Sequence, residues 1–418
     1  MCIFVRIFDY QIKYTFMVPE INIKEYNYNL PDERIAKYPL PIRDSSKLLI
    51  YKEEQIRESI FNNISSELPE NAIMVFNDTK VVPARLHFQK PSGAHIEIFC
   101  LEPVMPSEYN LIFSEKKSCR WKCIVGNLKK WKENTLVLYN PSQDEAITSL
   151  GLTASLIEKQ GATSIIEFNW IDNSEFSRVL EISGSIPIPP YLKRDTEDLD
   201  LERYQTLYAK YRGSVAAPTA GLHFTETVLD SISDKGIDRE EVCLHVGAGT
   251  FVPVKSEFIS GHNMHREPFI VKLKFLEKLR NRKGKIVAVG TTSSRTLESL
   301  YFLGVKCIED GRPSDIEQWL PYKKEYNYTL NDSLDALIKY LNDNNLDEIK
   351  SSTQIIIVPG YKFRIIDILI TNFHQPQSTL LLLISAFLGG NWKTVYDYAL
   401  KNNFRFLSYG DSSLLFRA

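Results

Sequence analysis

The chain changes its hydrophobic period near residue 176, and this change limits the folds that it can adopt. Before that point, apolar and polar residues alternate in short segments separated by turn residues. Alternation with a period of two is typical of half-buried strands, and several such strands in a row favour a small antiparallel barrel of five or six strands. The segments are Arg85–Phe88, His95–Leu101, Arg120–Val125, Thr135–Tyr139 and Ser164–Phe168.

After residue 176, helical patterns alternate with short buried apolar runs, which predicts an α/β core with a mixed sheet. Thr225 is suited to cap a helix that begins at Glu226, and Gly236 to end it. The expected helices are Phe176–Ile182, Arg203–Tyr211, Glu226–Ser233, Arg295–Leu303, Leu334–Leu341, Thr379–Phe387 and Thr394–Lys401, and the expected strands are Ile237–Leu244, Lys285–Gly290, Ile355–Val358 and Ile365–Ile370.

Together these patterns predict a large mixed-sheet α/β domain with an inserted small antiparallel β-barrel domain. We place the first part of the α/β domain at residues 1–79, the barrel at 80–175 and the second part at 176–418. Residues 1–27 are expected to be an extension, in which Met17 is an alternative start. The segment 305–353 shows no chemistry and is interpreted as a surface excursion or an oligomer contact.

Composition places the chain among soluble globular proteins. Its 418 residues are 44% hydrophobic and 24% charged, which is ordinary for that class. No apolar run reaches the roughly 20 residues that a membrane span requires, and the six cysteines are scattered without a disulfide framework. We expect a cytoplasmic protein. The net charge of −2 argues against a general polyanion binder.

Short polar blocks that contain Gly, Thr and His follow several of the apolar runs. Histidines clustered in such turns are typical of a site built on loops, although tightly packed turns would give the same pattern. In the block at 289–295, a buried strand leads into Thr291, Thr292 and Ser293 and then a helix, which would seat a carboxylate or phosphate at the positive helix end. The blocks cover 215–225, 244–254, 262–267, 289–295, 371–376 and 408–411, and they hold His223, His245, His262, His265 and His374.

One stretch within the predicted barrel concentrates positive charge. Because tryptophans lie between its basic residues, it is a candidate for binding RNA phosphates while stacking an unpaired base. The alternative is a solvated hairpin whose tryptophans belong to the core. The candidate RNA-binding residues are Lys116, Lys117, Arg120, Trp121, Lys129, Lys130 and Lys132, with Lys122 and Trp131 beside them. The acidic run Asp195–Glu202 is expected to face solvent.

The ordered motifs resemble one enzyme family, the S-adenosylmethionine:tRNA ribosyltransferase-isomerases of queuosine biosynthesis. The resemblance extends from Tyr28 to Phe416, and it departs mildly at Arg266, Ser294 and the polar pair Ser412-Ser413. It rests on the polar blocks named above together with Pro41–Leu49, Val75–Leu86, Ile186–Arg194 and Glu202–Thr206.

The resemblance implies a reaction in which the ribosyl part of S-adenosylmethionine is transferred and isomerised. The acceptor is 7-aminomethyl-7-deazaguanine at the wobble position of tRNAs with a GUN anticodon, and the products are epoxyqueuosine, adenine and methionine. S-adenosylmethionine is then a co-substrate, no metal is implied, and we expect a monomer. Such chemistry needs a base beside the sulfonium, a proton donor for adenine and a carboxylate or aromatic face near the positive sulfur.

The predicted site residues follow from the blocks and the resemblance. Histidine can exchange protons near neutral pH, so His223, His245 and His265 are catalytic candidates. Asp78 is a fourth, as a carboxylate partner for the sulfonium or the ribose. Each also has a structural alternative, as a satisfied core histidine or a turn cap. The candidates for holding the substrate or co-substrate are Arg85, Thr219, Gly221, Gly247, Gly249, Thr291, Thr292, Ser293, Arg295, His374 and Asp411.

Three other classes of protein fit the sequence less well. Gly247 and Gly249 lack the third glycine of a dinucleotide-binding fingerprint. His262 and His265 could bind zinc together with His223 or His245, but the HExxH glutamate of the common zinc hydrolases is missing. A non-catalytic RNA-binding protein would explain the basic stretch but not the histidine blocks outside it.

Overall fold

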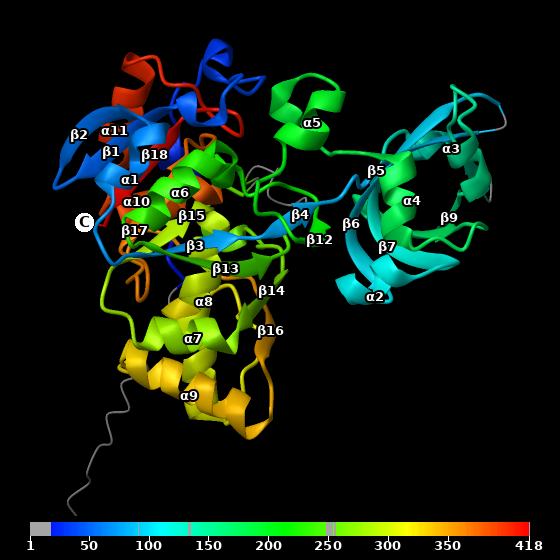
Figure 1. Cartoon of the computed structure of the whole chain (residues 1–418). Coiled ribbons are helices and arrows are strands. Elements are labelled where there is room, and N and C mark those ends of the chain that lie inside the picture. The colour runs from blue at the N-terminus through cyan, green and yellow to red at the C-terminus, as the bar shows by residue number, and fades with distance from the viewer. Residues whose placement is uncertain (1–17, 91, 133–134, 248–253, 255, 418) are drawn as a thin grey trace, which may run out of the picture.

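The protein consists of a large α/β body and a β-barrel that stands beside it (Figure 1). The computed structural model describes residues 18–90, 92–132, 135–247, 254 and 256–417. The predicted fold class, a mixed-sheet α/β fold with a small antiparallel barrel, is confirmed. The domain boundaries at residues 79/80 and 175/176 remain our proposal.

The body is built on a nine-stranded mixed sheet. Its strand order is β16-β14-β13-β3-β15-β17-β18-β1-β2, with parallel pairs at its centre and antiparallel pairs at both edges. Because β3, β15 and β17 are parallel neighbours, their carboxyl ends meet at one edge of the sheet. The strands are β1 Lys47–Lys52, β2 Gln55–Ile60, β3 Ile73–Asn77, β13 Asp238–Leu244, β14 Glu267–Lys272, β15 Ile286–Val289, β16 Glu348–Thr353, β17 Ile368–Asn372 and β18 Ser412–Phe416.

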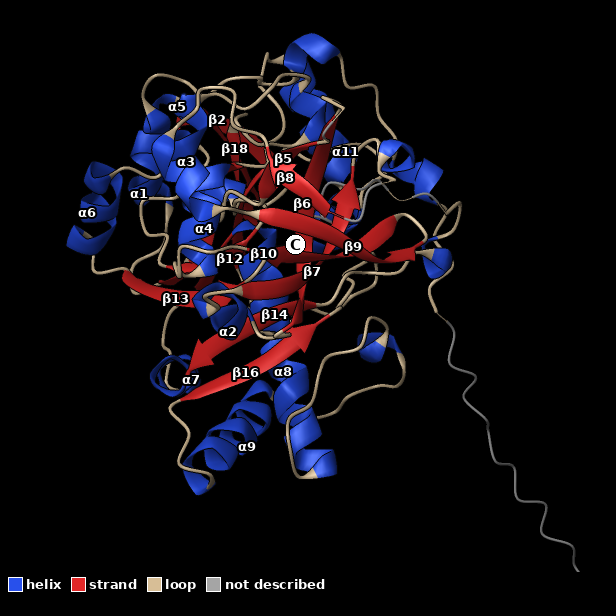
Figure 2. Ribbon diagram, turned by 90° about the vertical axis from the view of Figure 1, so that its right-hand side faces the viewer, coloured by secondary structure: helices blue, strands red, loops and turns tan. Residues whose placement is uncertain are grey.

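Alternating side chains of these strands pack into two separate cores. In β3, Ile73 and Val75 belong to the core that includes α7 to α11, whereas Met74 and Phe76 belong to the core with α1 and α6. Helices therefore cover both faces of the sheet, as Figure 2 shows for α6 and α11 on opposite sides of the strands. The helices are α1 Ile64–Glu67, α6 Glu226–Asp234, α7 Leu273–Arg280, α8 Gly290–Asp310, α9 Leu330–Asp343, α10 Thr379–Phe387 and α11 Trp392–Lys401.

The barrel has six antiparallel strands in the order β5-β6-β7-β10-β9-β8, and a pairing of β8 with β5 closes it. In β7, Cys119, Trp121 and Cys123 point inward and are buried. The strands are β5 Arg85–Gln89, β6 His95–Met105, β7 Ser118–Val125, β8 Thr135–Leu138, β9 Thr153–Gln160 and β10 Thr163–Asn169, with the helices α2 Tyr109–Ser114, α3 Glu145–Leu150 and α4 Phe176–Ser183 around them. Five of these strands were predicted from their alternation, and β9 was missed.

Two short parallel strands, β4 (Thr79–Val81) and β12 (Tyr211–Ser214), carry the chain from the body to the barrel and back (Figure 1). Between α4 and β12 lie the two-residue strand β11 (Gly184–Ser185) and helix α5 (Asp198–Arg203).

Several predicted elements differ from those observed. Residues 204–210 are not helical, and Ile355–Val358 is buried without forming a strand among the described residues. Helix α8 begins at Gly290, so Thr291–Ser294 form its first turn and do not precede it. The interpretation of 305–353 as a surface excursion is wrong, because α9 packs on α8 through Leu334 and Leu337, and β16 is a strand of the sheet.

The described part of the extension predicted for residues 1–27 packs against the body. Residues 18–27 include a short 3-10 helix, Ile23–Tyr26, in which Ile23 is buried and its N–H donates to the Glu257 carbonyl. The ring of Tyr26 stacks on Trp392 of α11. Throughout the described chain, no helix combines the length and the apolar character that crossing a bilayer would require.

Candidate active site

A cleft opens where the carboxyl ends of β15 and β17 meet the first turn of α8. Together with the solvent at its mouth, it encloses about 1180 Å³. All six polar blocks predicted from the sequence contribute to it, because their loops converge at the same edge of the sheet. The polar lining residues include Tyr191, Thr219, His262, His265, Glu267, Thr291, Thr292, Arg295, Thr371, Asn372, His374, Ser378, Thr379 and Ser408.

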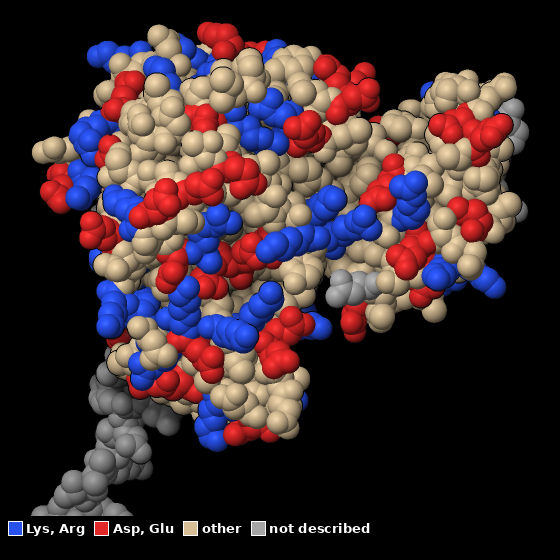
Figure 3. Space-filling model, viewed as in Figure 1, with Lys and Arg blue, Asp and Glu red and all other residues tan. Residues whose placement is uncertain are grey.

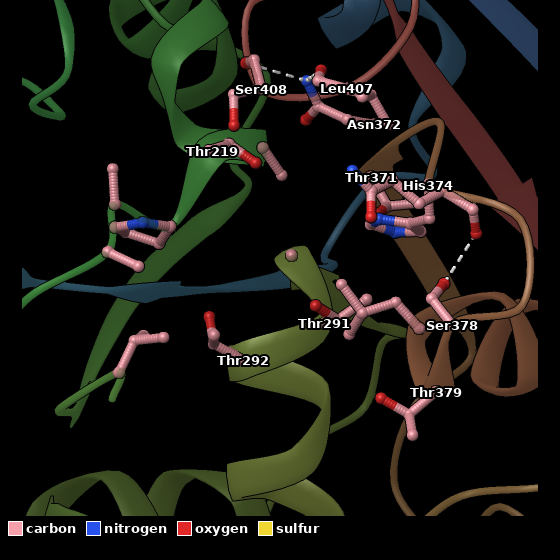
Figure 4. Close-up of a pocket in the computed structure, with 18 of the residues that line it drawn as sticks. Thr219, Thr291, Thr292, Thr371, Asn372, His374, Ser378, Thr379, Leu407 and Ser408 are labelled. Carbon is pink, nitrogen blue, oxygen red and sulfur yellow. Dashed lines mark hydrogen bonds between the residues drawn. The ribbon is translucent and has the colours of Figure 1, made fainter. Parts of the chain in front are cut away.

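The first turn of α8 forms one wall of the cleft. Gly290 has a φ of +88°, a conformation that glycine adopts without strain, and it turns the chain directly from β15 into the helix. The hydroxyls of Thr291 and Thr292 face the open space (Figure 4). The Thr292 hydroxyl is buried and has no hydrogen-bond partner among the described residues. This wall therefore offers a free hydroxyl and the positive end of a helix dipole to a ligand.

A buried ion pair between Arg295 and Glu267 lies deeper in the cleft. Both residues are largely buried, at 7% and 3% exposed, and Nη1 of Arg295 donates to Oε2 of Glu267. The Arg295 Nε donates to the Ile355 carbonyl at 3.2 Å. Nη2 of the same guanidinium is buried, and no described residue accepts from it. The ion pair thus presents an unused charged donor to a carboxylate.

Asn372 supplies the complementary group, a free acceptor. Its Nδ2 donates to the carbonyls of Leu407 and Ser408 at 3.1 and 3.3 Å (Figure 4), and it lies 3.3 Å from Nε2 of His223. These contacts fix the orientation of the amide. They leave Oδ1 buried without a donor from the described part of the chain. Oδ1 can therefore accept a hydrogen bond from a ligand in the cleft.

His223 lies behind Asn372 and does not line the cleft. Because Asn372 donates to Nε2, the proton of the imidazole is on Nδ1, which lies 2.9 Å from the Ser46 hydroxyl. Burial, followed by the charge of Arg405, lowers the pKa of His223 to about 3. The ring therefore remains neutral at physiological pH and orients the Asn372 amide.

Three other histidines do line the cleft. His374 lies with its Nε2 3.0 Å from the Thr371 hydroxyl, and burial lowers its pKa to about 4. His262 and His265 lie in one loop, and burial, followed by the nearby His265, lowers the pKa of His262. The His265 side chain is 49% exposed, and its Nδ1 is 4.0 Å from Oε1 of Glu102 on the barrel strand β6.

The His262–His265 loop is held by a residue from a segment in which the sequence showed no chemistry. Gln318 donates from Nε2 to the His262 carbonyl at 2.7 Å and accepts at Oε1 from the Met264 N–H at 2.9 Å. Gln354 donates to the Met264 carbonyl at 2.9 Å. Part of the segment 305–353 therefore positions two of the histidines of the cleft.

Comparison with known proteins agrees with this arrangement of motifs. A family model described as queuosine biosynthesis protein matches residues 23–415. A relative from Trichlorobacter lovleyi, named S-adenosylmethionine:tRNA ribosyltransferase-isomerase, is 37% identical over 402 residues, which cover 94% of this chain and 99% of the relative. A relative of the same name from Caldanaerobacter subterraneus subsp. tengcongensis is 38% identical and covers 94% of this chain and 98% of its own.

The chain belongs to the S-adenosylmethionine:tRNA ribosyltransferase-isomerase family. The resemblance inferred from the motifs is confirmed. A crystal structure described as S-adenosylmethionine tRNA ribosyltransferase from Thermotoga maritima is 28% identical, covering 94% of this chain and 99% of that one, with a TM-score of 0.45.

Not every residue predicted for this ribosyltransferase-isomerase family member lies in the cleft. His265, Thr219, Thr291, Thr292, Arg295 and His374 line it. Ser293 lies in α8, where its hydroxyl donates to the Val289 carbonyl at 2.8 Å. Gly221 lies in the 3-10 helix Thr219–His223, where an added Cβ would lie 2.0 Å from the Tyr208 hydroxyl. Gly247 is outside the cleft lining, and Gly249 lies outside the described residues.

His245 belongs to the junction between the body and the barrel. Its Nδ1 lies 3.0 Å from the Thr79 hydroxyl, and its ring lies 4.9 Å from the ring of Tyr109 in α2. Burial lowers the pKa of His245 to about 4. Gly213 leaves room for the imidazole, since a Cβ there would lie 2.4 Å from Nδ1.

Asp78, Arg85 and Asp411 also lie outside the cleft lining. Burial, followed by the charge of Glu241, raises the pKa of Asp78 to about 7. Arg85 lies on the barrel, with its Nη1 3.7 Å from a Glu97 oxygen. Asp411 accepts from the backbone N–H groups of Lys47 and Arg405 at 3.1 and 2.8 Å, so it braces the loop that precedes β18.

The basic stretch of the barrel requires one correction. Trp121 is fully buried and Trp131 nearly so, and therefore neither indole offers a face to a base; that part of the prediction is wrong. Arg120 pairs with Glu167 at 2.8 Å. Acidic and basic side chains are interspersed over the face in Figure 3. Lys116 and Lys117 are exposed before β7, whereas Lys129, Lys130 and Lys132 are exposed after it. Contact of these lysines with RNA remains a prediction.

Sequence reasoning did not single out Glu267 or Asn372, although both lie within the polar blocks. The sequence held a signal for each. Asn372 is the last residue of the buried strand β17, and Glu267 is the first residue of β14, beside the strand β13. Polar residues at such strand ends lie at the edge of the sheet where ligands bind.

Proposed function

We propose that this chain catalyses the reaction for which its relatives are named, the transfer and isomerisation of the ribosyl part of S-adenosylmethionine on tRNA. In the finer form of the proposal, the acceptor is 7-aminomethyl-7-deazaguanine at the wobble position of tRNAs with a GUN anticodon. The products are epoxyqueuosine, adenine and methionine, and the reaction takes place in the cytoplasm. The single observation that carries the proposal is the cleft with its unpartnered buried groups.

The unpartnered groups fit S-adenosylmethionine in number and in kind. Nη2 of Arg295 is a charged donor suited to the methionine carboxylate. Oδ1 of Asn372 is an acceptor suited to an amine or a ribose hydroxyl, and the Thr292 hydroxyl can act in either sense. The carboxylate of Glu267, which lines the same cleft, supplies negative charge for the sulfonium.

The base and a hydrogen-bonding partner for the leaving adenine are proposed among the cleft histidines. His265 lines the cleft with its side chain half exposed, and its imidazole is the proposed base for the proton beside the sulfonium. His374 remains neutral near pH 7 because burial lowers its pKa to about 4, so its ring can share a hydrogen bond with departing adenine without carrying charge. His223 and His245 have positioning roles in this proposal. His223 orients the amide of Asn372, and His245 packs at the junction between the body and the barrel.

Product analysis tests the proposal. The purified chain would be incubated with S-adenosylmethionine and tRNA that carries the aminomethyl base, and the same tRNA with unmodified guanine would be the control. We expect a mass gain on the modified RNA only, matched by adenine and methionine in solution. Adenine and methionine in equal amounts without any change in the RNA would refute the transfer.

A further inference from the structure

A second, smaller recess is lined in part by the segment 408–410, next to the cleft. Its walls carry three arginines from separate parts of the chain: Arg43, Arg203 at the end of α5, and Arg405 in the loop before β18. Ser408 lines both the recess and the cleft. The recess is small and opens to solvent.

Two of the three positive charges lack an acidic partner. Within the described chain, neither Arg43 nor Arg203 lies within ion-pair distance of a carboxylate, whereas Arg405 lies 3.6 Å from Asp411. Nη1 of Arg43 donates to the carbonyls of Gln205 and Leu222 at 3.0 and 3.2 Å. Nη2 of Arg43 donates to the Glu202 carbonyl at 3.0 Å, and the nearby Glu202 carboxylate offsets part of the Arg43 charge. Backbone carbonyls satisfy hydrogen bonds but do not cancel a full charge, so three arginines against Asp411 and Glu202 leave an excess of positive charge.

Arg203 also has a donor to spare. Its Nη1 and Nη2 donate to the carbonyls of Pro41 and Leu40 at 3.2 and 2.7 Å. Its Nε is buried, and no described residue accepts from it. Burial, followed by the neighbouring charge of Arg203, lowers the pKa of Arg43. Two half-buried guanidinium groups that lie close to one another, with one buried donor left over, indicate that an anionic partner is missing.

We propose that the recess binds one phosphate-type oxyanion between Arg43, Arg203 and Arg405, and that the backbone of the RNA substrate supplies it. Guanidinium groups match the geometry of phosphate oxygens, and three of them can grip a tetrahedral anion from different sides. His223 lines the recess as a neutral ring and adds no charge. Only the identity of the anion source rests on the proposed function.

The first test is a titration of the full chain with inorganic phosphate, followed by phosphorus NMR at an ionic strength held constant with sodium chloride. We expect one saturable site, and we expect Arg203→Gln to weaken it about tenfold, as removal of a charge-assisted hydrogen bond implies. The matched control is Arg57→Gln, on a surface pair with Glu67, which should leave the phosphate affinity unchanged. Lack of saturation in the wild type would overturn the site, as would equal affinity in a folded Arg203→Gln variant.

A second arm identifies the source of the anion. Binding of a tRNA anticodon stem-loop would be measured over a range of salt concentrations for the same variants. If RNA supplies the phosphate, Arg203→Gln lowers the salt slope by about one unit and inorganic phosphate competes with the RNA. Unchanged RNA binding alongside a positive phosphate titration would leave the oxyanion site and overturn RNA as its source. Neither arm requires catalysis, so failure of the proposed transfer reaction is a separate result.

Discussion

At the scale of single residues, the site depends on groups that the protein leaves unpaired. Asn372 is 2% exposed, and its orientation is fixed by His223 and by two carbonyls, while its oxygen has no donor among the described residues. A buried polar atom without a partner costs free energy, so such an atom at the wall of a cleft is explained by a ligand that completes it.

Removal of the Asn372 acceptor should therefore impair binding and turnover. We expect Asn372→Ala to lower kcat/KM for S-adenosylmethionine by about ten- to a hundredfold. His223→Ala should lower it by about tenfold, because the amide then loses one of the three contacts that orient it. The exposed His87 on β5 provides the control, and His87→Ala should match the wild type. Wild-type kinetics in folded Asn372→Ala would refute the role of the acceptor.

The buried histidines also predict how stability depends on pH. The folded-state pKa of His223 is about 3, below the ordinary value of about 6.5. As the pH falls below about 6.5, the unfolded chain therefore takes up a proton that the folded chain does not, and stability is lost. At pH 5 this decrease is about 2 kcal/mol for His223 alone. Asp78 acts in the opposite direction, because its raised pKa favours folding at low pH.

Urea denaturation at pH 7 and pH 5 measures this effect. His223→Gln should lose about 2 kcal/mol less than the wild type between the two values of pH, whereas His87→Gln should behave as the wild type. A His223→Gln variant with the full acid sensitivity of the wild type would contradict the assignment of His223 as a buried neutral ring.

Sequence reasoning located the polar blocks but not the role of each residue within them. The blocks converge on one cleft because they follow strands whose order in the sheet is not readable from their order in the chain. His223 and Thr291 both lie in polar blocks that follow apolar runs, yet His223 lies behind Asn372 and Thr291 lines the cleft. Which face of a loop meets the cleft is decided by tertiary packing, so direct contact could not be predicted.

At the scale of elements, helix α5 shows how a local pattern can mislead. The acidic run Asp195–Glu202 was predicted to face solvent, but Asp200 is fully buried. Arg194 binds both of its carboxylate oxygens at 2.7 Å, and the Tyr409 hydroxyl donates to one of them at 2.7 Å. Burial raises the pKa of Asp200, but these hydrogen bonds outweigh it and hold the pKa below its usual range.

The Asp200 network should contribute to the stability of this element. Asp200→Asn leaves the Arg194 charge buried without its partner, which should cost about 3 kcal/mol in the free energy of unfolding. The exposed Asp198 in the same helix is the control, and Asp198→Asn should change stability by less than about 0.5 kcal/mol. Hydrogen exchange of residues 186–205 should accelerate in Asp200→Asn alone; equal protection in both variants would contradict the role of the network.

The barrel was predicted correctly, because apolar and polar residues alternate along five of its six strands. Its tryptophans were placed wrongly at the surface. In β7 the inward positions are Cys119, Trp121 and Cys123, so the same alternation that revealed the strand puts Trp121 inside. The strand β9 was missed because its second half, Ile157–Gln160, is exposed and mostly polar. Alternation of apolar and polar residues is therefore lost over half of the strand.

The exposed lysines of the barrel still predict a contribution to RNA binding. Reversal of Lys129 and Lys130 to Glu should weaken tRNA binding and lower its salt slope by about one unit for each RNA phosphate that the protein no longer neutralises. Lys339→Glu on the exposed side of α9 is the control. An unchanged salt slope would identify this end of the barrel as a solvated surface.

At the scale of the whole molecule, the barrel stands next to the mouth of the cleft. Glu102 of β6 lies 4.0 Å from His265, and Tyr109 of α2 contacts His245, so the body and the barrel meet at two places besides the β4–β12 link. An RNA that places a base in the cleft would therefore lie between them. The domain order could be predicted from the change in period, but this relative placement could not, since it rests on a few contacts between distant segments.

The most direct test of the account is a single-turnover measurement of adenine release. Wild type, Arg295→Lys and the surface control Arg57→Lys would be mixed with S-adenosylmethionine and tRNA carrying the aminomethyl base. We predict that release depends on that tRNA, that Arg57→Lys matches the wild type, and that Arg295→Lys requires about tenfold more S-adenosylmethionine because lysine cannot offer the planar donor fork. Release without RNA, or an unchanged requirement in folded Arg295→Lys, would contradict the assignment of the cleft as the active site.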